Sequence, residues 1–288
     1  MNDGARSEYD LRTTAELVDL INRQDLAVPS AVRLAAHSIE RAVDSIVERL
    51  SQGGRLIYVG AGSSGRLAEL DAFECVATFG VDENEIVAVV AGGLDAQPLD
   101  AAAAEDDDAA GAADVLSLTL SEHDVVVGVS ASGETAYVTG GLEAASRAGA
   151  LTIAVVCAAR STHASLADQA IEVAVGPELI QGSTRLKAGT AQKLVLNTLS
   201  TVSMIRLGRT FGNLMVSVAP ANDKLRARLR RVVAAATGAP DKQVDEALDA
   251  AGGDGKVAVV SLLAGVDTET AAARLRDANG NVRQAAAG

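Results

Sequence analysis

Aromatic residues are nearly absent from this sequence: Phe, Trp and Tyr together make up 2% of the 288 residues, and there is no Trp. Its core must therefore be built from Ala, Val, Leu and Ile, which supply most of the 48% of residues that are hydrophobic. Proteins that bind single-stranded nucleic acid usually stack the bases on aromatic side chains. The composition argues against a stacking surface of that kind.

Positive charge is also scarce. The chain has 25 Lys and Arg against 38 Asp and Glu, which gives a net charge of -13 at pH 7 and an isoelectric point near 4.7. A nucleic acid backbone needs a broad basic surface, so we expect no nucleic acid partner. A small anion bound in one local basic pocket remains compatible with this composition.

Cysteine and histidine are too few to suggest a metal site. Cys75 and Cys157 fit neither a disulfide framework nor the spacing of metal ligands. His37, His123 and His163 lie far apart in the sequence and form no metal-binding or catalytic-triad pattern. Acid and base chemistry is therefore expected to come from carboxylates.

Long hydrophobic runs are missing as well. The first ten residues contain no apolar signal core, and the longest apolar runs, such as 151–159, are much shorter than the roughly 20 residues that span a bilayer. We therefore expect no membrane segment and a location in the reducing cytoplasm.

Short apolar runs rich in Val and Ile alternate with segments of helix length from residue 55 onward. The runs are apolar throughout, as are strands of a parallel sheet that is covered by helices on both faces. The fold predicted is a doubly wound α/β core with five parallel strands, at residues 56–59, 86–90, 125–129, 152–156 and 171–175.

Helices are predicted on either side of this sheet. Thr13 and Glu16 fit a capping box, and apolar residues at helical spacing follow Pro29. A long, largely buried helix is predicted over 186–207, and the charged, Ala-rich tail after 222 predicts short helices for packing or dimerisation rather than direct binding. The expected division is N-terminal helices over 1–50, a sheet domain over 51–212 and a C-terminal helical subdomain over 213–288.

The first predicted strand runs into GAGSSGR at residues 60–66, which has the glycine spacing of a dinucleotide-binding loop. The second predicted strand, however, is followed by Ala-Gly-Gly rather than by the acidic residue that would bind a ribose, so NAD is disfavoured. Ser63, Ser64 and Gly65 would instead offer hydroxyl and N–H groups to a phosphate or a sugar. A plain tight turn is the alternative.

A second polar loop, SASGET at residues 130–135, follows the third predicted strand. The carboxyl ends of parallel strands meet at one edge of a sheet, where ligands of such folds bind. Two loops rich in Ser, Gly and Thr at that edge favour a phosphorylated small molecule. The residues expected to bind it from this loop are Ser130, Ser132, Gly133 and Thr135.

A third polar cluster, GSTRLKAGTAQK at residues 182–193, opens the predicted long helix and supplies local positive charge. Ser183, Thr184 and Lys187 are the candidates for substrate binding here. Both Lys187 and Lys193 could equally be solvated surface charges.

Two carboxylates are distinguished by their positions. Glu74 is expected at the end of the helix after GAGSSGR, in the apolar segment LDAFECVATFG, where partial burial would raise its pKa. Glu105 lies in AAAAEDDD on the carboxyl side of the sheet. Without further information Glu105 is one of several solvated acids.

These segments together resemble the N-acetylmuramic acid 6-phosphate etherases, which are members of the sugar isomerase (SIS) fold group. The resemblance covers nearly the whole chain and is most specific in GSTRLKAGTAQKLVLN. It extends over TAELVDLINRQDLAVPSAV, GGRLIYVGAGSSGRLAELDAFEC, AEDD, DVVVGVSASGETAYV and VGPELIQGSTRLKAGTAQKLVLNTLSTVSMIRLGRTFGNLMV.

The resemblance implies cleavage of the D-lactyl ether of N-acetylmuramic acid 6-phosphate to N-acetylglucosamine 6-phosphate and D-lactate, in peptidoglycan recycling. It implies a cytoplasmic homodimer with no metal or organic cofactor. By motif, the two functional glutamates are Glu74 and Glu105. We assign Glu105 as the base that removes the proton on C2 of the opened sugar, and Glu74 as the acid that protonates the departing lactate.

The chain departs from the family pattern DASECPPTFG at three positions: Phe73 replaces a small hydroxyl residue, and Val76 and Ala77 replace two prolines. We expect these changes to affect loop rigidity and rate rather than the type of reaction.

Two other functions share parts of these motifs. Animal glucokinase regulatory proteins have this fold and bind a sugar phosphate without catalysis, but both glutamates and the short single core of this chain argue against that function. A sugar-phosphate isomerase would need the phosphate loops and a base, but no acid for a leaving group.

Overall fold

A five-stranded parallel sheet forms the centre of the computed structural model, which describes residues 8–218 and 222–288. The strand order is β2-β1-β3-β4-β5, and each neighbouring pair is parallel. The predicted doubly wound α/β fold is therefore confirmed. The strands are β1 (Leu56–Gly60), β2 (Ile86–Val90), β3 (Val125–Ser130), β4 (Leu151–Val156) and β5 (Gln169–Glu172).

The position of the fifth strand was predicted wrongly. β5 begins at Gln169 rather than at residue 171, and its ladder with β4 ends at Glu172. Val173 and Val175 are nevertheless buried against the core. Their apolar character extended the prediction, because burial beyond the end of a ladder looks the same in the sequence as burial within it.

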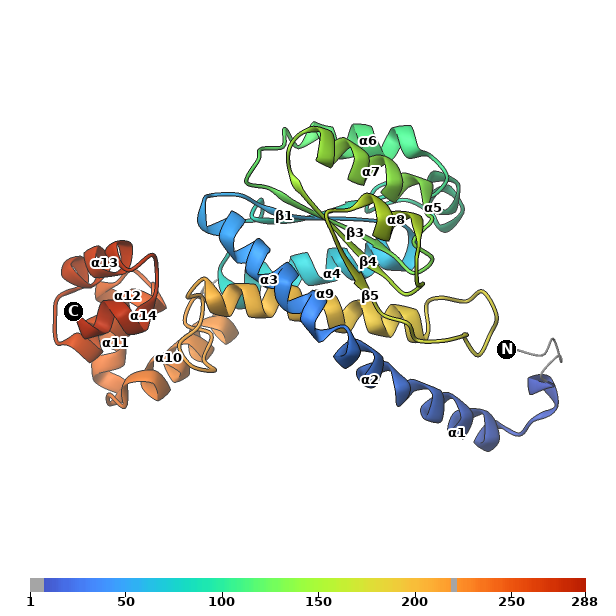
Figure 1. The fold of residues 1–288 in the computed structure, drawn as a ribbon. Helices are drawn as coiled ribbons and strands as arrows, with labels where there is room; N and C mark the ends of the chain where they lie inside the picture. Colours follow the sequence, from blue (N-terminus) through green and yellow to red (C-terminus); the bar gives the residue numbers. More distant parts are fainter. Residues whose placement is uncertain (1–7, 219–221) are drawn as a thin grey trace.

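Helices cover both faces of the sheet (Figure 1). Alternate residues of β1 point to opposite faces, so Leu56 and Tyr58 join one apolar cluster while Ile57 and Val59 join another. The first face is covered by α3 (Ala36–Ser51), α4 (Gly62–Phe79) and α9 (Lys187–Arg206), and the second by α6 (Asp108–Ser117) and α7 (Ala136–Arg147). Two short helices, α5 (Pro98–Ala104) and α8 (Thr162–Leu166), lie in the connections.

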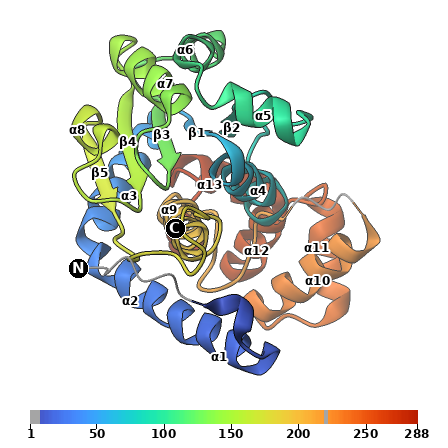
Figure 2. The same ribbon diagram turned by 90° about the vertical axis from the view of Figure 1, so that its right-hand side faces the viewer.

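The N-terminal arm, α1 (Thr14–Asp25) and α2 (Ala27–Leu34), extends away from the sheet (Figures 1 and 2). A short 3-10 helix (Tyr9–Leu11) precedes it, and the predicted capping box of Thr13 and Glu16 is confirmed. Pro29 lies within the first turn of α2, where a missing N–H is tolerated. No residue of α1 is buried, and the arm exposes Val18, Ile21, Leu26 and Leu34.

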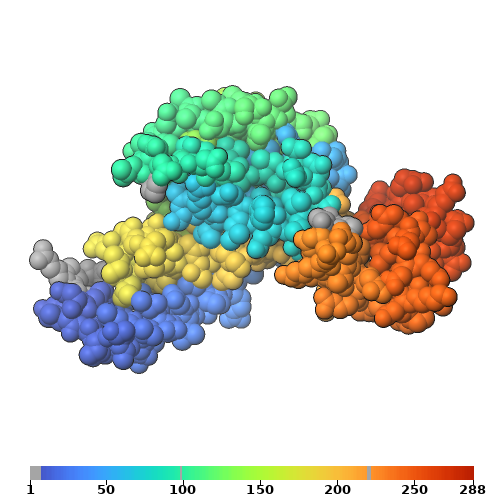
Figure 3. Space-filling view, turned by 180° about the vertical axis from the view of Figure 1, so that it is seen from behind, coloured from blue at the N-terminus to red at the C-terminus, as the bar shows by residue number. Residues whose placement is uncertain are grey.

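The C-terminal residues fold into a helical bundle with an apolar core of its own. It forms a distinct lobe in Figure 3, and the Ser217 hydroxyl, in the segment before α10, donates to the Arg209 carbonyl oxygen of the sheet domain (3.0 Å). The predicted C-terminal helices are thus confirmed. They are α10 (Asp223–Thr237), α11 (Asp241–Ala250), α12 (Gly255–Ala264), α13 (Thr268–Asp277) and α14 (Val282–Ala287).

Local sequence explains where these helices begin. α10, α12, α13 and α14 each start after an Asn or Asp whose side chain accepts an N–H of the first turn. Among the described residues, no helix is both long enough and apolar enough to cross a membrane.

A buried carboxylate joins α4 to the sheet and to α9. Asp71 is only 5% exposed, and its oxygens accept hydrogen bonds from the Tyr58 hydroxyl (2.8 Å), the Asn197 amide (3.0 Å) and the Ser200 hydroxyl (3.1 Å). Burial raises the pKa of Asp71, while the hydrogen bonds from Tyr58 and Ser200 act in the opposite direction. The network sets the position of α4 relative to α9.

Replacing Asp71 by alanine is expected to lower the free energy of unfolding by about 3 kcal/mol, because three buried donors lose their acceptor. Urea denaturation followed by circular dichroism measures the change. The control Glu122→Ala, at an exposed carboxylate, should change stability by less than about 0.5 kcal/mol. A loss in Asp71→Ala no larger than in this control would show that the network contributes nothing to stability.

Candidate active site

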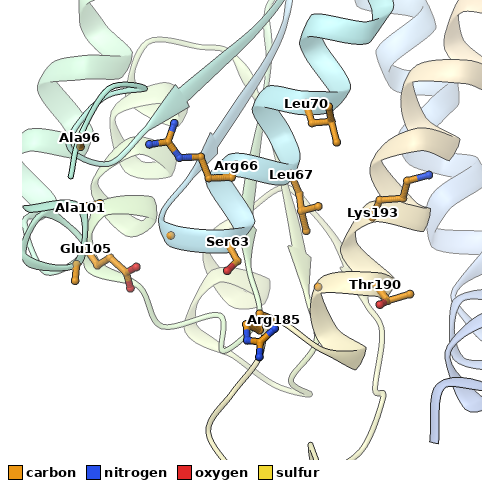
Figure 4. Close-up of a pocket in the computed structure, with 13 residues that line it drawn as sticks. Ser63, Arg66, Leu67, Leu70, Ala96, Ala101, Glu105, Arg185, Thr190 and Lys193 are labelled. Carbon is orange, nitrogen blue, oxygen red and sulfur yellow. The ribbon is translucent and has the colours of Figure 1, made fainter. Parts of the chain in front are cut away.

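A cavity of about 780 Å³ lies between α4, the segment around α5 and the start of α9 (Figure 4). We call it the α4–α9 cavity. Its floor and walls combine apolar side chains with a few polar and charged ones. The polar and charged lining residues are Ser63, Arg66, Glu105, Arg185, Thr190 and Lys193.

Glu105 lies at the end of α5 and is half-buried in this cavity. One carboxylate oxygen lies so close to Gly62 that a Cβ at that position would stand 2.5 Å from it. Gly62 also has a φ of +52°, so glycine is needed there both for the backbone and for the carboxylate. Burial raises the pKa of Glu105, and the neighbouring charge of Asp106 raises it further.

The serine loop, residues 130–135, follows β3 and leads into α7. The Ser130 hydroxyl lies 3.3 Å from the Ser132 hydroxyl and 3.0 Å from that of Thr135, and it accepts the N–H of Gly133 (3.0 Å). The loop is connected to Glu105, because the N–H of Tyr137 donates to the Glu105 carbonyl oxygen (3.1 Å). The four residues predicted to bind phosphate here are thus close together, but none of them lines the α4–α9 cavity.

His163 supports the serine loop from below and was not expected to have a role. It is fully buried, its N–H donates to the Gly133 carbonyl (3.0 Å), and its Nε2 lies 3.1 Å from the Thr135 carbonyl oxygen. The same nitrogen lies 3.0 Å from the Thr139 hydroxyl. Burial lowers the pKa of His163, which keeps this ring neutral. The sequence does not predict this contact, because His163 lies 28 residues after Thr135 and matches no known motif with it.

The three residues predicted from GAGSSGR have different surroundings. Ser63 is exposed and lines the cavity. The Ser64 hydroxyl instead donates to the Gln192 side chain on α9 (3.0 Å), so it joins two helices. Gly65 packs against Gly60, where a Cβ would come within 2.8 Å of the backbone. Only Ser63 of the three therefore lies in position to meet a ligand in this cavity.

The start of α9 is already occupied by a carboxylate of the chain itself. Glu178 accepts the N–H groups of Lys187 (3.0 Å) and Ala188 (2.9 Å), which an anionic ligand would otherwise use. Lys187 is buried and lines a smaller cavity of about 180 Å³, which shares Arg185 and Thr190 with the α4–α9 cavity. Lys187 was predicted to bind substrate, but its side chain does not line the α4–α9 cavity.

Of the other candidate residues in the GSTRLKAGTAQK cluster, some line the α4–α9 cavity and others do not. Ser183 and Thr184 form the turn before α9 and do not line the α4–α9 cavity. Arg185 and Lys193 do line it. The positive charge expected from this cluster is present, but on different residues from those selected.

Glu74 is exposed and lies within α4, one turn beyond Leu70 on the same side of the helix. The expected apolar surroundings are absent, because α4 continues to Phe79 and the neighbouring Phe73 is itself 75% exposed. Twelve residues separate Glu74 from Gly62, which is about 18 Å along a helix. Glu74 and Glu105 of one chain thus cannot reach neighbouring atoms of one small molecule.

The described residues contain no group of three or more His, Cys, Asp or Glu side chains that could hold a metal ion.

Sequence comparisons identify the relatives of this chain. The family model of the glucokinase regulatory protein N-terminal SIS domain matches residues 38–146, and that of the SIS domain matches residues 103–202. The N-acetylmuramic acid 6-phosphate etherase of Streptomyces avermitilis is 50% identical over 98% of this chain and 90% of its own length. The etherase of Rubrobacter xylanophilus is 51% identical over 97% of this chain and 92% of its own length.

Solved structures with low sequence identity share the fold. A phosphoheptose isomerase from Neisseria gonorrhoeae has 21% identity and a TM-score of 0.52, and the match covers 66% of this chain and 98% of the isomerase. The Vibrio vulnificus NanR protein, solved with ManNAc-6P, has 16% identity and a TM-score of 0.50, with 68% and 65% of the two chains covered. The SIS fold is thereby confirmed.

Replacing Asp106 by asparagine is expected to lower the pKa of Glu105, because a like charge that disfavours ionisation is removed. Glu105 then stays ionised to a lower pH than in the parent. Carbon-13 NMR titration of labelled glutamate carboxyl groups measures the shift. Asp108→Asn should leave Glu105 unchanged, and an unchanged or higher pKa in Asp106→Asn would contradict this electrostatic assignment.

Proposed function

This chain belongs to the N-acetylmuramic acid 6-phosphate etherase family, and we infer that it cleaves the D-lactyl ether of N-acetylmuramic acid 6-phosphate in peptidoglycan recycling. The products are N-acetylglucosamine 6-phosphate and D-lactate. About 50% identity to etherases along nearly the whole chain is the observation that carries this function. The match to an etherase extends over 98% of this chain, which disfavours the alternative functions of a non-catalytic regulator and of a sugar-phosphate isomerase.

Glu105 is proposed as the base of the reaction. Opening of the sugar ring exposes an aldehyde at C1, which acidifies the proton on C2. The raised pKa of the Glu105 carboxyl makes it a stronger base than a solvated glutamate. Removal of the C2 proton allows the C3–O bond to break, which forms a C2–C3 double bond and releases lactate.

The departing lactate oxygen needs a proton, and we assign that proton to Glu74. Along α4, Glu74 of the same chain lies about 18 Å from Gly62, the residue that the Glu105 carboxylate contacts. The Glu74 that would complete the site is therefore the partner subunit's Glu74. Water then adds to the double bond: its oxygen joins C3 while Glu105 returns a proton to C2. The two carboxyl groups thus reverse their roles in the second half of the reaction.

The serine loop is proposed to bind the phosphate, together with Ser63. Its hydroxyl and N–H groups stand at the start of α7, a helix of 12 residues, where a negative charge is stabilised. The bond between Tyr137 N–H and the Glu105 carbonyl holds base and loop in one arrangement. A phosphate on the loop therefore sets the distance of C2 from the base.

The proposed homodimer would use surfaces that one chain leaves uncovered. α9 contributes little of this surface, because it packs largely against α2, α3 and α4 of its own chain. The N-terminal arm is uncovered instead: Leu26 is 76% and Leu34 is 88% exposed. Phe73 and Leu70 are also exposed on either side of Glu74. A second copy on these surfaces would enclose Glu74 as well as cover apolar area.

The three departures from the family pattern fall on a helix. Val76 and Ala77 continue α4 to Phe79, so an effect on loop rigidity is not what the structure indicates. Phe73 lies on the surface proposed for the dimer. A cytoplasmic location is proposed because Cys75 and Cys157 are both free thiols, which suits a reducing compartment.

Hydrogen exchange at C2 should distinguish the roles of the two glutamates. Glu74→Ala is expected to stop D-lactate release while still exchanging the C2 hydrogen with deuterated water, because proton removal needs only the base. Glu105→Ala should lose both, by about a hundredfold to ten-thousandfold. Proton NMR follows the exchange, and an enzymatic assay follows D-lactate. The opposite pattern would exchange the two roles, and full activity in either variant would remove that residue from the mechanism.

Mixing the two inactive variants tests whether the site is shared between subunits. In a mixture of Glu74→Ala and Glu105→Ala subunits, each mixed dimer has one site with both glutamates, so about a quarter of the parental activity should return. Unfolding and refolding the variants together allows exchange of subunits, and each variant treated alone is the control. If no activity returns although mixed dimers are detected by mass spectrometry, both glutamates come from one chain.

A further inference from the structure

Two positive side chains of the α4–α9 cavity are exposed and pair with no carboxylate within ion-pair distance in the described parts of the chain, although the charge of Lys193 acts on the buried carboxylate of Asp71. Arg185 lies just before α9 and Lys193 on its second turn, and neither makes an ion pair or a side-chain hydrogen bond there. The third cation of this cavity is different, because Arg66 pairs with Glu69 (3.2 Å) and donates to the Leu94 carbonyl. Two positive charges are thus available to a ligand.

Arg185 and Lys193 do not neutralise the charge of Glu105. No ion pair links either of them to this carboxylate, although all three residues line one cavity (Figure 4). The nearest charge acting on Glu105 is that of Asp106, which is negative. An anionic ligand would be drawn to the side of the cavity where Arg185 and Lys193 lie.

The substrate of the proposed reaction carries two anionic groups, a phosphate on C6 and the carboxylate of the lactyl group on C3. The serine loop and Ser63 suit the phosphate, and they include neither Lys nor Arg. Glu105 must reach C2, and C3 is the next carbon. The group on C3 would therefore extend from Glu105 into the cavity, toward the unpaired cations.

We propose that Arg185 and Lys193 bind the lactyl carboxylate, and that they thereby select the ether substrate over sugar phosphates without that group. This inference rests on the proposed function. A guanidinium can form two parallel hydrogen bonds to a carboxylate, and an ammonium adds a compact charge. The contact also offsets repulsion between the lactyl carboxylate and Glu105, and it is lost once lactate has left.

The test compares substrate with product, because only the substrate has the carboxylate. Arg185→Gln and Lys193→Met should each raise KM for N-acetylmuramic acid 6-phosphate about tenfold to a hundredfold. The inhibition constant of N-acetylglucosamine 6-phosphate should change by less than about twofold. Lys242→Met removes a lysine that is 88% exposed on the C-terminal bundle, and it should change neither value.

A neutral analogue supplies a second measurement. The lactamide of N-acetylmuramic acid 6-phosphate should bind the parent at least about tenfold more weakly than the acid. The double variant should not distinguish acid from amide. Ser132→Ala, by contrast, should weaken binding of acid, amide and product alike, because all three carry the phosphate.

Three results would overturn the inference. Equal weakening of substrate and product in the Arg185 and Lys193 variants would show that these cations bind the phosphate. Parental affinity for both compounds would show that they bind neither anionic group. If the parent releases no D-lactate from N-acetylmuramic acid 6-phosphate, the proposed function fails and this inference fails with it, whereas the first two results leave the etherase activity intact.

Discussion

The buried carboxylate of Asp71 is the interaction on which the geometry of the site depends. Asp71 belongs to α4 and accepts hydrogen bonds from residues of β1 and α9. Helices α4 and α9 form facing walls of the α4–α9 cavity. Burial raises the pKa of this carboxyl, while the charge of Lys193 acts in the opposite direction. A buried hydrogen-bonded network of this kind favours one arrangement of its elements, whereas apolar contacts alone would permit small shifts.

The two glutamates proposed as base and acid have different surroundings. Glu105 is held against Gly62 in a half-buried position, while Glu74 stands on the exposed side of α4. In a single chain Glu74 has no apolar cover. In the proposed dimer a second chain would enclose Glu74 and complete the site.

A chain of net charge -13 that binds an anionic sugar phosphate must concentrate its attraction locally. The serine loop offers hydroxyl and N–H dipoles, which in the proposed site would bind the phosphate without adding positive charge near Glu105. The positive side chains stand instead along α9 and the segment before it. Arg66, Arg185 and Lys193 line the same cavity as Glu105, but none forms an ion pair with it, and such a pair would weaken the proposed base by lowering its pKa.

Local patterns in the sequence were sufficient for the strands, the helices and the polar loops. Apolar runs predicted four strands to within about one residue, and Thr13 with Glu16 predicted the first long helix. The motif at 130–135 likewise indicated a compact cluster of hydroxyl groups, because all its members lie within six residues. Such features depend on neighbours along the chain, which a sequence displays directly.

Contacts between distant segments decided everything else about the site. Ser64 bonds to Gln192 across 128 positions, Glu178 occupies the start of α9, and His163 supports a loop that ends 28 residues earlier. Only the length and direction of α4 revealed that Glu74 and Glu105 lie far apart in one chain. These outcomes depend on how helices pack on the sheet, since packing determines which side chains are buried and which remain available to a ligand.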